Sequence, residues 1–507
     1  MAMSVSRAHV DSSRLASLLA AARAQALAGR RQVLVSLSER VPTLDPLVAL
    51  ESLVRASMSD GQLAEHVAAG RMYWTRPRDG FTLAGVGAVA TFAPTGLDRF
   101  ASVDGAWASL LDGALVDNPS GGAPGLGPVL MGGFAFEPQG PRTGQWRGFP
   151  GAHLIVPRLQ LTSVGGQCWV TISVLVGTDG EPDVDPEALA RLRHTALTTP
   201  TPTSDDEPTS DALPDGLAFS EPRSAAEWRT LVGTAVSEIR AGALQKVVLA
   251  RAVHAAASRE MDVFAMLRHL RAAHHNSFVF GYWRGARAFV GASPERLVRL
   301  DGRDVRASSL AGTAKRGATP DEDAAIAALL LASAKDRAEH AAVRDALYGG
   351  LAEICDEVTA LGVPSLLTLP HVHHLHTAIR ARLRDGHSLF DLVARLHPTP
   401  AVGGTPRDAA LRFIREHEQL DRGWYAAPIG WVGRQNGEFA VALRSAVLAG
   451  CEATLFAGCG IVADSDPELE FAESLLKLQP MQSAIAAALV QAPSGSTEVV
   501  AGSEHLL

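Results

Sequence analysis

The chain has 507 residues, of which 47% are hydrophobic and 20% charged, and its formal net charge is −8. These values are typical of a globular protein and do not favour a general nucleic-acid-binding surface. Four dispersed cysteines without CxxC spacing argue against a structural zinc site and favour free thiols in a reducing compartment. No apolar run reaches membrane-spanning length, so we expect a cytoplasmic protein.

The first half of the chain predicts strands after a short helical extension. Residues 1–30 are predicted to be an N-terminal extension with an alanine-rich helix over 12–29, which Arg14 and Arg23 distinguish from a signal peptide. Strand-like segments follow at 32–37, 82–90 and 168–176. The segment 199–215 is rich in Pro, Thr, Ser and Asp, which predicts a loop or linker. Composition alone would allow a domain boundary there.

The second half mixes helices with strands, which predicts an α+β protein with mostly antiparallel strands. Ser224 and Glu227 form a capping box for a helix, and Thr405 before Pro406 is predicted to cap another. A polar tail from 491 is predicted to be flexible. The other predicted helices are 320–333, 336–354, 388–396, 406–419 and 466–489, and the predicted strands are 246–251, 278–283, 287–291, 427–432, 438–447 and 452–457.

The helix predicted from 466 carries the first candidate site. Asp466 is a suitable N-cap, and Glu470, Glu473 and Lys477 fall on one stripe, at i, i+3 and i+7. Two carboxylates one turn apart can hold a hard cation, and a lysine one turn further can hold an anion beside it. The alternative is a solvated Glu473–Lys477 pair on the surface. A neighbouring apolar stripe contains Leu469, Ala472, Leu475 and Leu476.

Three further charged residues stand in unusual settings. Glu339 lies near a predicted helix start, where it could face the helix dipole or join Glu470 and Glu473 in an oxygen site suited to Mg²⁺. Glu295 follows a proline at a strand end and could be aimed into a cleft or lie on the surface. Lys246 begins a strand with small apolar residues on its face, and a desolvated lysine can act as a base.

The sequence also contains short loops that could bind a carboxylate. The glycine loops at 310–313 and 457–461 could offer backbone N–H groups, although glycine turns often serve only to turn the chain. The segment 396–406 is dense in proline and glycine. His374 is predicted to form hydrogen bonds rather than to bind zinc, because no cysteine or HExxH pattern accompanies it.

These segments together resemble the chorismate-utilising enzymes, a family that includes isochorismate, salicylate, anthranilate and aminodeoxychorismate synthases. The resemblance covers residues 224–485 and extends upstream through GGFAF at 132–136. It implies one domain over 31–490, with two large antiparallel sheets stacked face to face, helices outside, an N-terminal half 31–198, an exposed loop 199–215 and a catalytic half 216–490. The matching motifs are KVVLAR, GASPERL, LAGT, KDRAEH, VHHL, HPTPAVGGTP, RGWYAAPIGW, FAVALRSA, AGCGI and DPELEFAES.

The resemblance also implies roles for individual residues. Mg²⁺ would be held by Glu339, Glu470 and Glu473, and His374 would lie beside the substrate ring near the departing hydroxyl. Cys459 stands where the family more usually has alanine. The residues implied to contact the carboxylates of chorismate are Arg444, Tyr425, Lys477, Gly312, Thr313 and Gly458.

The nucleophile distinguishes the members of the family. A lysine at the position of Lys246 implies water addition, whereas Ala311 stands where aminodeoxychorismate synthases carry a nucleophilic lysine. We therefore expect an isochorismate synthase of the menaquinone or siderophore type, with Lys246 as base and Glu295 as acid. Salicylate synthase, an aminating enzyme and a silent chorismate-binding protein are the alternatives. We expect a monomer or weak dimer with no glutaminase, nucleic-acid or membrane partner.

Overall fold

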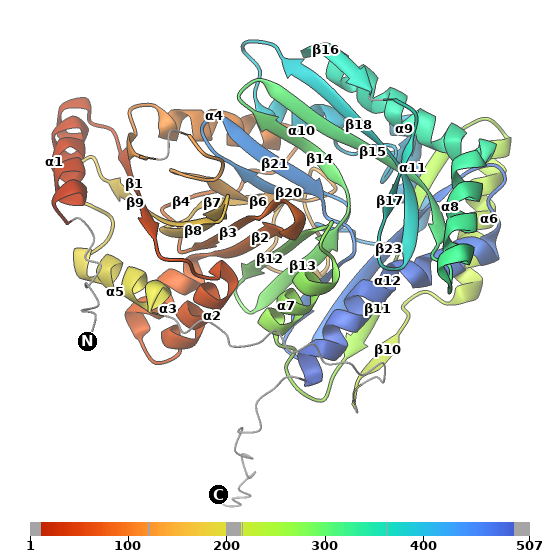
Figure 1. The fold of residues 1–507 in the computed structure, drawn as a ribbon, viewed down its shortest axis with the longest axis horizontal. Coiled ribbons are helices and arrows are strands. Elements are labelled where there is room, and N and C mark those ends of the chain that lie inside the picture. The colour runs from red at the N-terminus through yellow and green to blue at the C-terminus, as the bar shows by residue number, and fades with distance from the viewer. Residues whose placement is uncertain (1–11, 120–121, 199–213, 215, 361, 491–507) are drawn as a thin grey trace, which may run out of the picture.

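Two large β-sheets lie face to face in the computed structural model, with helices on their outer faces (Figure 1). The structure describes residues 12–119, 122–198, 214, 216–360 and 362–490. The inner faces of the sheets share one hydrophobic core, in which Phe81 of one sheet stacks on Trp431 of the other at 5.2 Å. The predicted α+β class and the stacked antiparallel sheets are confirmed.

The larger sheet has thirteen strands and is antiparallel except where β1 and β5 pair in parallel. Its hydrogen-bonded order is β10 (Ala218–Ser220), β11 (Lys246–Ala256), β23 (Glu452–Ile461), β22 (Ser445–Ala449), β13 (Arg287–Ser293), β12 (Phe278–Arg284), β2 (Arg71–Arg76), β3 (Phe81–Val86), β8 (Leu159–Val164), β9 (Gln167–Val176), β1 (Val33–Val41) and β5 (Leu115–Asp117), and β19 (Gly404–Thr405) pairs with β11.

The smaller sheet has ten strands, and its neighbouring strands pair antiparallel. Its order is β16 (Cys355–Ala360), β18 (Val372–Leu383), β15 (Asp304–Lys315), β14 (Arg296–Asp301), β21 (Asn436–Val441), β20 (Pro428–Val432), β6 (Leu130–Phe134), β7 (Ala152–Val156) and β4 (Ala90–Phe92), and β17 (Ser365–Thr368) pairs with β18.

The helices cover the outer faces of the sheets, and several of them begin at a residue whose side chain caps the helix. Ser224 and Glu227 form the predicted capping box. None of the helices in the described ranges is long and apolar enough to cross a bilayer. The helices are α1 (Ser12–Gly29), α2 (Pro46–Ser57), α3 (Gly61–Ala69), α4 (Arg99–Leu111), α5 (Pro186–Leu197), α6 (Ala225–Arg240), α7 (Val263–Ala273), α8 (Pro320–Ala332), α9 (Ala334–Ala352), α10 (Leu389–Leu396), α11 (Arg407–Phe413) and α12 (Pro467–Val490).

Strands from both sides of the segment 199–215 hydrogen-bond within each sheet, since β2 pairs with β12 and β6 pairs with β20. Within that segment the structure describes only Pro214, and the predicted tail 491–507 also lies outside the described residues. The division of the chain into an extension, one domain and a tail therefore stays a prediction.

Three local predictions are wrong. The segment 82–90 is not one strand, because β3 ends at Val86 in the larger sheet and β4 begins at Ala90 in the smaller one. The segment 438–447 is not one strand, because β21 ends in the smaller sheet and β22 begins in the larger one, with Arg444 at the crossing in the left-handed region (φ +47°). Thr405 does not cap α11. As part of β19, Thr405 pairs with Lys246 of β11, and no side-chain cap is formed at Pro406.

Candidate active site

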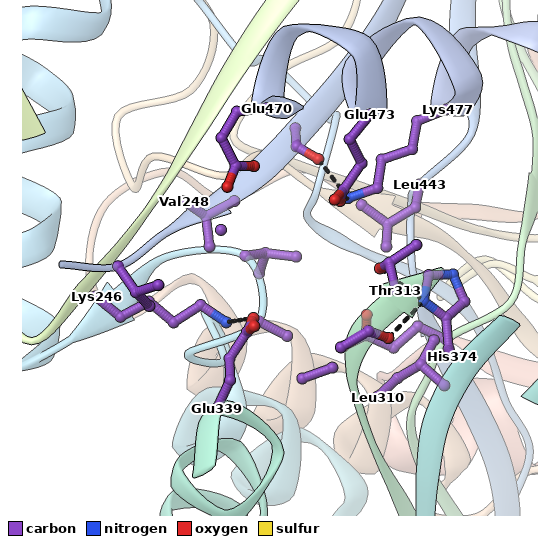
Figure 2. A pocket seen from close by; sticks show the side chains of 18 of the residues that line it. Lys246, Val248, Leu310, Thr313, Glu339, His374, Leu443, Glu470, Glu473 and Lys477 are labelled. Carbon is purple, nitrogen blue, oxygen red and sulfur yellow. Dashed lines mark hydrogen bonds and ion pairs between the residues drawn. The ribbon is translucent and has the colours of Figure 1, made fainter. Parts of the chain in front are cut away.

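A cavity of about 360 Å³ is lined by all twelve residues predicted for the site. Strands β11, β15 and β18 and helices α9 and α12 contribute side chains to it, and β23 contributes the backbone of two glycines (Figure 2). The remaining side chains come from segments between elements, in particular Glu295, Tyr425 and Arg444. Residues that are up to 231 positions apart, such as Lys246 and Lys477, thus meet in one site.

Two neighbouring sheet crossings place Glu295 and Arg444 in this cavity. The chain passes from the larger to the smaller sheet between β13 and β14, at Pro294 and Glu295, and returns between β21 and β22 at Arg444. Backbone hydrogen bonds tie the crossings together, from Val441 N–H to Glu295 O at 3.1 Å and from Ala292 N–H to Arg444 O at 3.0 Å. The fold therefore sets an acid and a cation side by side between the sheets.

The first turns of α12 present their charged face to the cavity. Asp466 caps the helix, because its Oδ1 accepts from the N–H groups of Glu468 and Leu469 at 2.9 and 3.1 Å. The Glu473–Lys477 pair exists at 2.6 Å, but it lines the cavity rather than a solvated face. The apolar stripe of this helix is not buried in a core, since the exposed fraction of Leu469 is 70%.

Glu470 and Glu473 form the part of the site best suited to a divalent cation. One carboxylate oxygen of each and the Sγ of Cys459 lie within 4.8 Å of one another. Burial, followed by the Glu473 charge, raises the pKa of Glu470 to about 7. Two carboxylates that repel each other in a partly desolvated site gain from a shared hard cation, so this donor set fits Mg²⁺.

Glu339 is not part of that close group. It lies across the cavity, where its Oε1 accepts from Lys246 Nζ at 2.7 Å (Figure 2). Burial raises the pKa of Glu339, but the ammonium groups of Lys246, Lys477 and Lys335 outweigh it and leave the pKa below its usual value. The pair is tightly enclosed, since a Cβ atom on Gly460 would lie 2.8 Å from Lys246 Cε. Metal binding by Glu339 stays a prediction.

Glu295 has the environment of a neutral carboxylic acid. Its exposed fraction is 4%, and burial raises its pKa to about 8 against the opposing effect of Lys246, Arg444 and Lys477. The group is therefore mainly protonated at neutral pH and can donate a proton.

His374 forms hydrogen bonds, as was predicted because no cysteine or HExxH pattern accompanies it in the sequence. Its Nδ1 lies 3.1 Å from Thr313 Oγ1 and 3.3 Å from Gly312 O. We assign the proton to Nδ1, because the carbonyl can only accept. Burial, followed by the Arg444 charge, lowers the pKa of His374 to about 3. Nε2 has no partner among the described residues and can accept a hydrogen bond from a substrate hydroxyl.

Cationic and neutral donors line the same cavity, and Lys477 is paired with Glu473. Among the described residues no carboxylate lies within ion-pair distance of Arg444, whereas Lys477 Nζ also donates to Gly458 O at 2.9 Å. Burial raises the pKa of Tyr425 to about 12, so its hydroxyl remains a neutral donor. Gly312 sits at a β-bulge with φ +77°, and this bulge separates Ala311 from Thr313 in register.

The sequence analysis did not identify Arg422, a buried arginine that lines the cavity and connects two segments of its wall. Arg422 pairs with Glu418 through two contacts of 2.7 and 2.5 Å and also donates to Val402 O and Val248 O. It thereby joins the proline- and glycine-rich loop to β11. The four-residue spacing of Glu418 and Arg422 was the available signal, but the π-helical turn that carries Glu418 is not visible in the sequence.

A second arginine holds α12 against β11. Arg251 donates to Ser474 Oγ at 2.9 Å and its guanidinium lies 4.5 Å from the ring centre of Phe471. Ser474 directly follows Glu473, so this contact fixes the helix turn that carries the carboxylates. It links the strand of Lys246 to the predicted metal ligands.

The comparison with known families matches this arrangement. A family model described as "Chorismate binding enzyme" matches residues 20–486. The chain belongs to this chorismate-binding enzyme family. The family's members act on chorismate, a dicarboxylate that suits a cavity with cationic anchors and a candidate cation site.

Relatives within the family are similar over most of their length. The chain is 39% identical to the salicylate biosynthesis isochorismate synthase of Pseudomonas aeruginosa, over 91% of this chain and 92% of that protein. It is 37% identical to the isochorismate synthase MenF of Bacillus subtilis, over 89% and 93%. The structure of MenF, the menaquinone-specific isochorismate synthase of Escherichia coli, superposes with a TM-score of 0.69 and 25% identity over 92% of this chain and 100% of that chain.

Proposed function

We propose that the protein is an isochorismate synthase, which converts chorismate to isochorismate by adding water at C2 and releasing the C4 hydroxyl. The observation that carries the proposal is the presence of a buried lysine and a buried acid of pKa about 8 in the same cavity, Lys246 and Glu295. A base for water and an acid for a departing hydroxyl are the two groups that this reaction needs. The names of the relatives above support the same reaction.

The proton transfers balance within the chain's own residues. Lys246 leaves its contact with Glu339 and gives its ammonium proton to solvent. The neutral amine then takes a proton from water and so activates the oxygen that bonds to C2. The two ring double bonds shift, and the C4–O bond breaks. Glu295 gives its proton to the departing oxygen, which leaves as water. The reaction is therefore a net isomerisation, and the lysine returns the proton to the glutamate through solvent before the next cycle.

The substrate is held in the cavity by its carboxylates. Arg444, Lys477 and Tyr425 line the cavity and supply donors, and Gly458, Gly312 and Thr313 also line it. Arg444 has no carboxylate partner in the described chain, so its guanidinium is available for bidentate binding. Fixing both carboxylates brings C2 close to Lys246 and C4 close to Glu295. The loss of translational and rotational entropy then occurs on binding, which lowers the barrier of the chemical step.

Glu470 and Glu473, with Glu339 from across the cavity, would hold Mg²⁺. When bound, the ion supplies positive charge that orients and neutralises a substrate carboxylate. Lys246 must be free of Glu339 to act as a base. Glu339 can therefore bind the ion only after its contact with Lys246 has been broken.

The direct test is incubation of the protein with chorismate and Mg²⁺, followed by chromatographic separation of the products. We expect isochorismate as the sole product. Salicylate together with pyruvate would instead identify a salicylate synthase, and turnover that requires ammonia would identify an aminating enzyme. Complete absence of turnover with retained chorismate binding would identify a silent binding protein.

A further inference from the structure

A second cavity, of about 170 Å³, lies outside the active site and has no role in the proposed reaction. It is enclosed by α9, by the end of α10 and by the proline- and glycine-rich segment 396–406. None of the residues that line it also lines the active-site cavity. The two cavities are therefore separate, although α9 and the segment 396–406 contribute residues to both.

The lining of the second cavity combines apolar side chains with two positive charges. Arg395 and Arg407 supply the two guanidinium groups, and none of the described residues in the lining is acidic. A lining of this kind suits a ligand with an apolar body and one anionic group. The apolar side chains are those of Ala346, Leu347, Leu396, Pro398 and Pro400.

Arg407 is held in place by backbone oxygens rather than by a carboxylate. Its Nη2 donates to His397 O, and its Nη1 lies 3.5 Å from Arg395 O. Partial burial lowers the pKa of Arg407, and the charge of Arg395 adds to this effect while Asp408 opposes it. Arg395 pairs with Glu353 at 2.6 Å, but both side chains are exposed, so this contact contributes little. Two guanidinium groups that repel each other gain from a shared anion.

We propose that the second cavity is a regulatory site for a small carboxylate with a single ring. Arg395 and Arg407 hold the carboxylate, and the ring lies against the leucine and proline side chains. The volume agrees with this class of ligand, because a cavity of about 150 Å³ can hold benzene. The ligand binds without any covalent or redox step.

The walls of the second cavity also carry active-site residues. Helix α9 contributes Leu347 to this cavity and Glu339 to the active site, and Thr405 lines this cavity while it pairs in register with Lys246. A ligand that fits the cavity in its present shape favours the present arrangement, in which Lys246 and Glu339 are paired. Because this pair must separate before the reaction, we expect the ligand to inhibit turnover.

The test of binding is a calorimetric titration of the protein with benzoate, in the absence of chorismate and Mg²⁺. We expect the wild type to bind benzoate and not benzyl alcohol, which has the same ring without the charge. Arg407→Gln should lower the benzoate affinity by about tenfold to a hundredfold, the value of a charge-assisted hydrogen bond. Ala346→Leu keeps both arginines but fills the space of the ring, and it should also block binding. Ala346 is an exposed helical residue, so we expect this variant to fold.

Arg412→Gln is the matched control, because Arg412 is an exposed arginine of the same helix, α11, that does not line the cavity. It should retain the benzoate affinity of the wild type. Arg444→Ala should also retain it, since Arg444 belongs to the active site. The site would be overturned if the wild type did not bind benzoate, or if Arg407→Gln bound it as tightly as the wild type.

The test of regulation is turnover of chorismate with Mg²⁺, and this part of the inference rests on the proposed function. Saturating benzoate should lower kcat/KM of the wild type by at least about fivefold, the lower end of typical coupling between sites. Arg407→Gln should have the turnover of the wild type without benzoate and should resist the inhibition. Equal inhibition of both proteins would overturn the regulatory role.

The outcomes separate this inference from the proposed function. Benzoate binding that depends on Arg407, in a protein that forms no isochorismate, would support the site and remove the reaction. Isochorismate formation in a protein without such binding would leave the reaction standing and remove the site.

Discussion

The Nζ atom of Lys246 lies 2.7 Å from Oε1 of Glu339, so the predicted base and one predicted metal ligand neutralise each other in the structure. The side chains are 93 residues apart in sequence and both are largely buried. Their contact gives each a partner that it must leave before it can act on substrate or cation. The same contact explains how a buried lysine is tolerated at the start of β11.

The ion pair predicts strong coupling between the two residues in stability. Lys246→Met or Glu339→Gln alone leaves one buried group without its partner and should lower the free energy of unfolding by about 3 kcal/mol. The double variant should lose clearly less than the sum, as measured by urea unfolding in metal-free buffer. The exposed pair Arg23–Glu181 is the control, and its coupling should stay below about 1 kcal/mol. Additive losses at Lys246 and Glu339 would refute the coupling.

Lys246→Ala should lower kcat for isochorismate formation by about a hundredfold to ten-thousandfold, the range for loss of a general base. Chorismate affinity, measured by calorimetry in the presence of Mg²⁺, should change by only a few fold because the carboxylate anchors remain. Unchanged turnover in this variant would remove Lys246 from its assigned role.

Activity should fall as the pH rises through about 8, because Glu295 then loses the proton that it must donate. Glu295→Gln should abolish most turnover over the whole pH range, since an amide cannot supply that proton. A wild-type profile of kcat against pH with no alkaline decline in this region would contradict the assignment.

The same group also predicts a pH-dependent stability. The pKa of Glu295 is raised from 4.5 to about 8 on folding, so its contribution to stability is present at low pH and is lost as the pH rises across that interval. The free energy of unfolding of the wild type should therefore fall, relative to Glu295→Gln, by about 1.4 kcal/mol per pH unit there. Parallel stability curves for the two proteins between these pH values would show that the group is not desolvated.

Two substitutions at Arg444 should distinguish its role in substrate binding from the strain of its backbone. Arg444→Ala and Arg444→Gly should both raise KM for chorismate by about tenfold to a hundredfold, the value of a charge-assisted hydrogen bond to a carboxylate. Because φ is +47° at this position, the glycine variant should unfold with a free energy about 1 kcal/mol higher than the alanine variant. Equal stabilities of the two variants would argue against strain at the crossing.

Much of the site could be predicted from the sequence because its residues stand in family motifs with fixed spacing, and all twelve line one cavity. The fold followed from the same resemblance. The pairing of Lys246 with Glu339 could not be predicted, because a contact between β11 and α9 depends on how distant segments pack. The cap at Asp466 was predictable, since it depends on neighbouring residues only.

Predictions from local sequence patterns were wrong where tertiary structure determines the conformation or the burial of a segment. Residues 439–447 are apolar except for Arg444 and Ser445 and contain no glycine or proline, so no turn residue marks the change of sheet at Arg444. On α12 the leucines suggested a buried stripe, but Leu469 and Leu475 are exposed because the cavity, rather than a core, lies against the charged face. A functional site thus reverses the usual relation between polarity and burial.

The origin of the new hydroxyl group tests the central claim most directly. Chorismate should be converted by the protein with Mg²⁺ in heavy-oxygen water, and the product should be analysed by mass spectrometry. We expect isochorismate that carries one heavy oxygen atom per molecule, derived from the water that Lys246 activates. Isochorismate without the label, or a product other than isochorismate, would contradict the account.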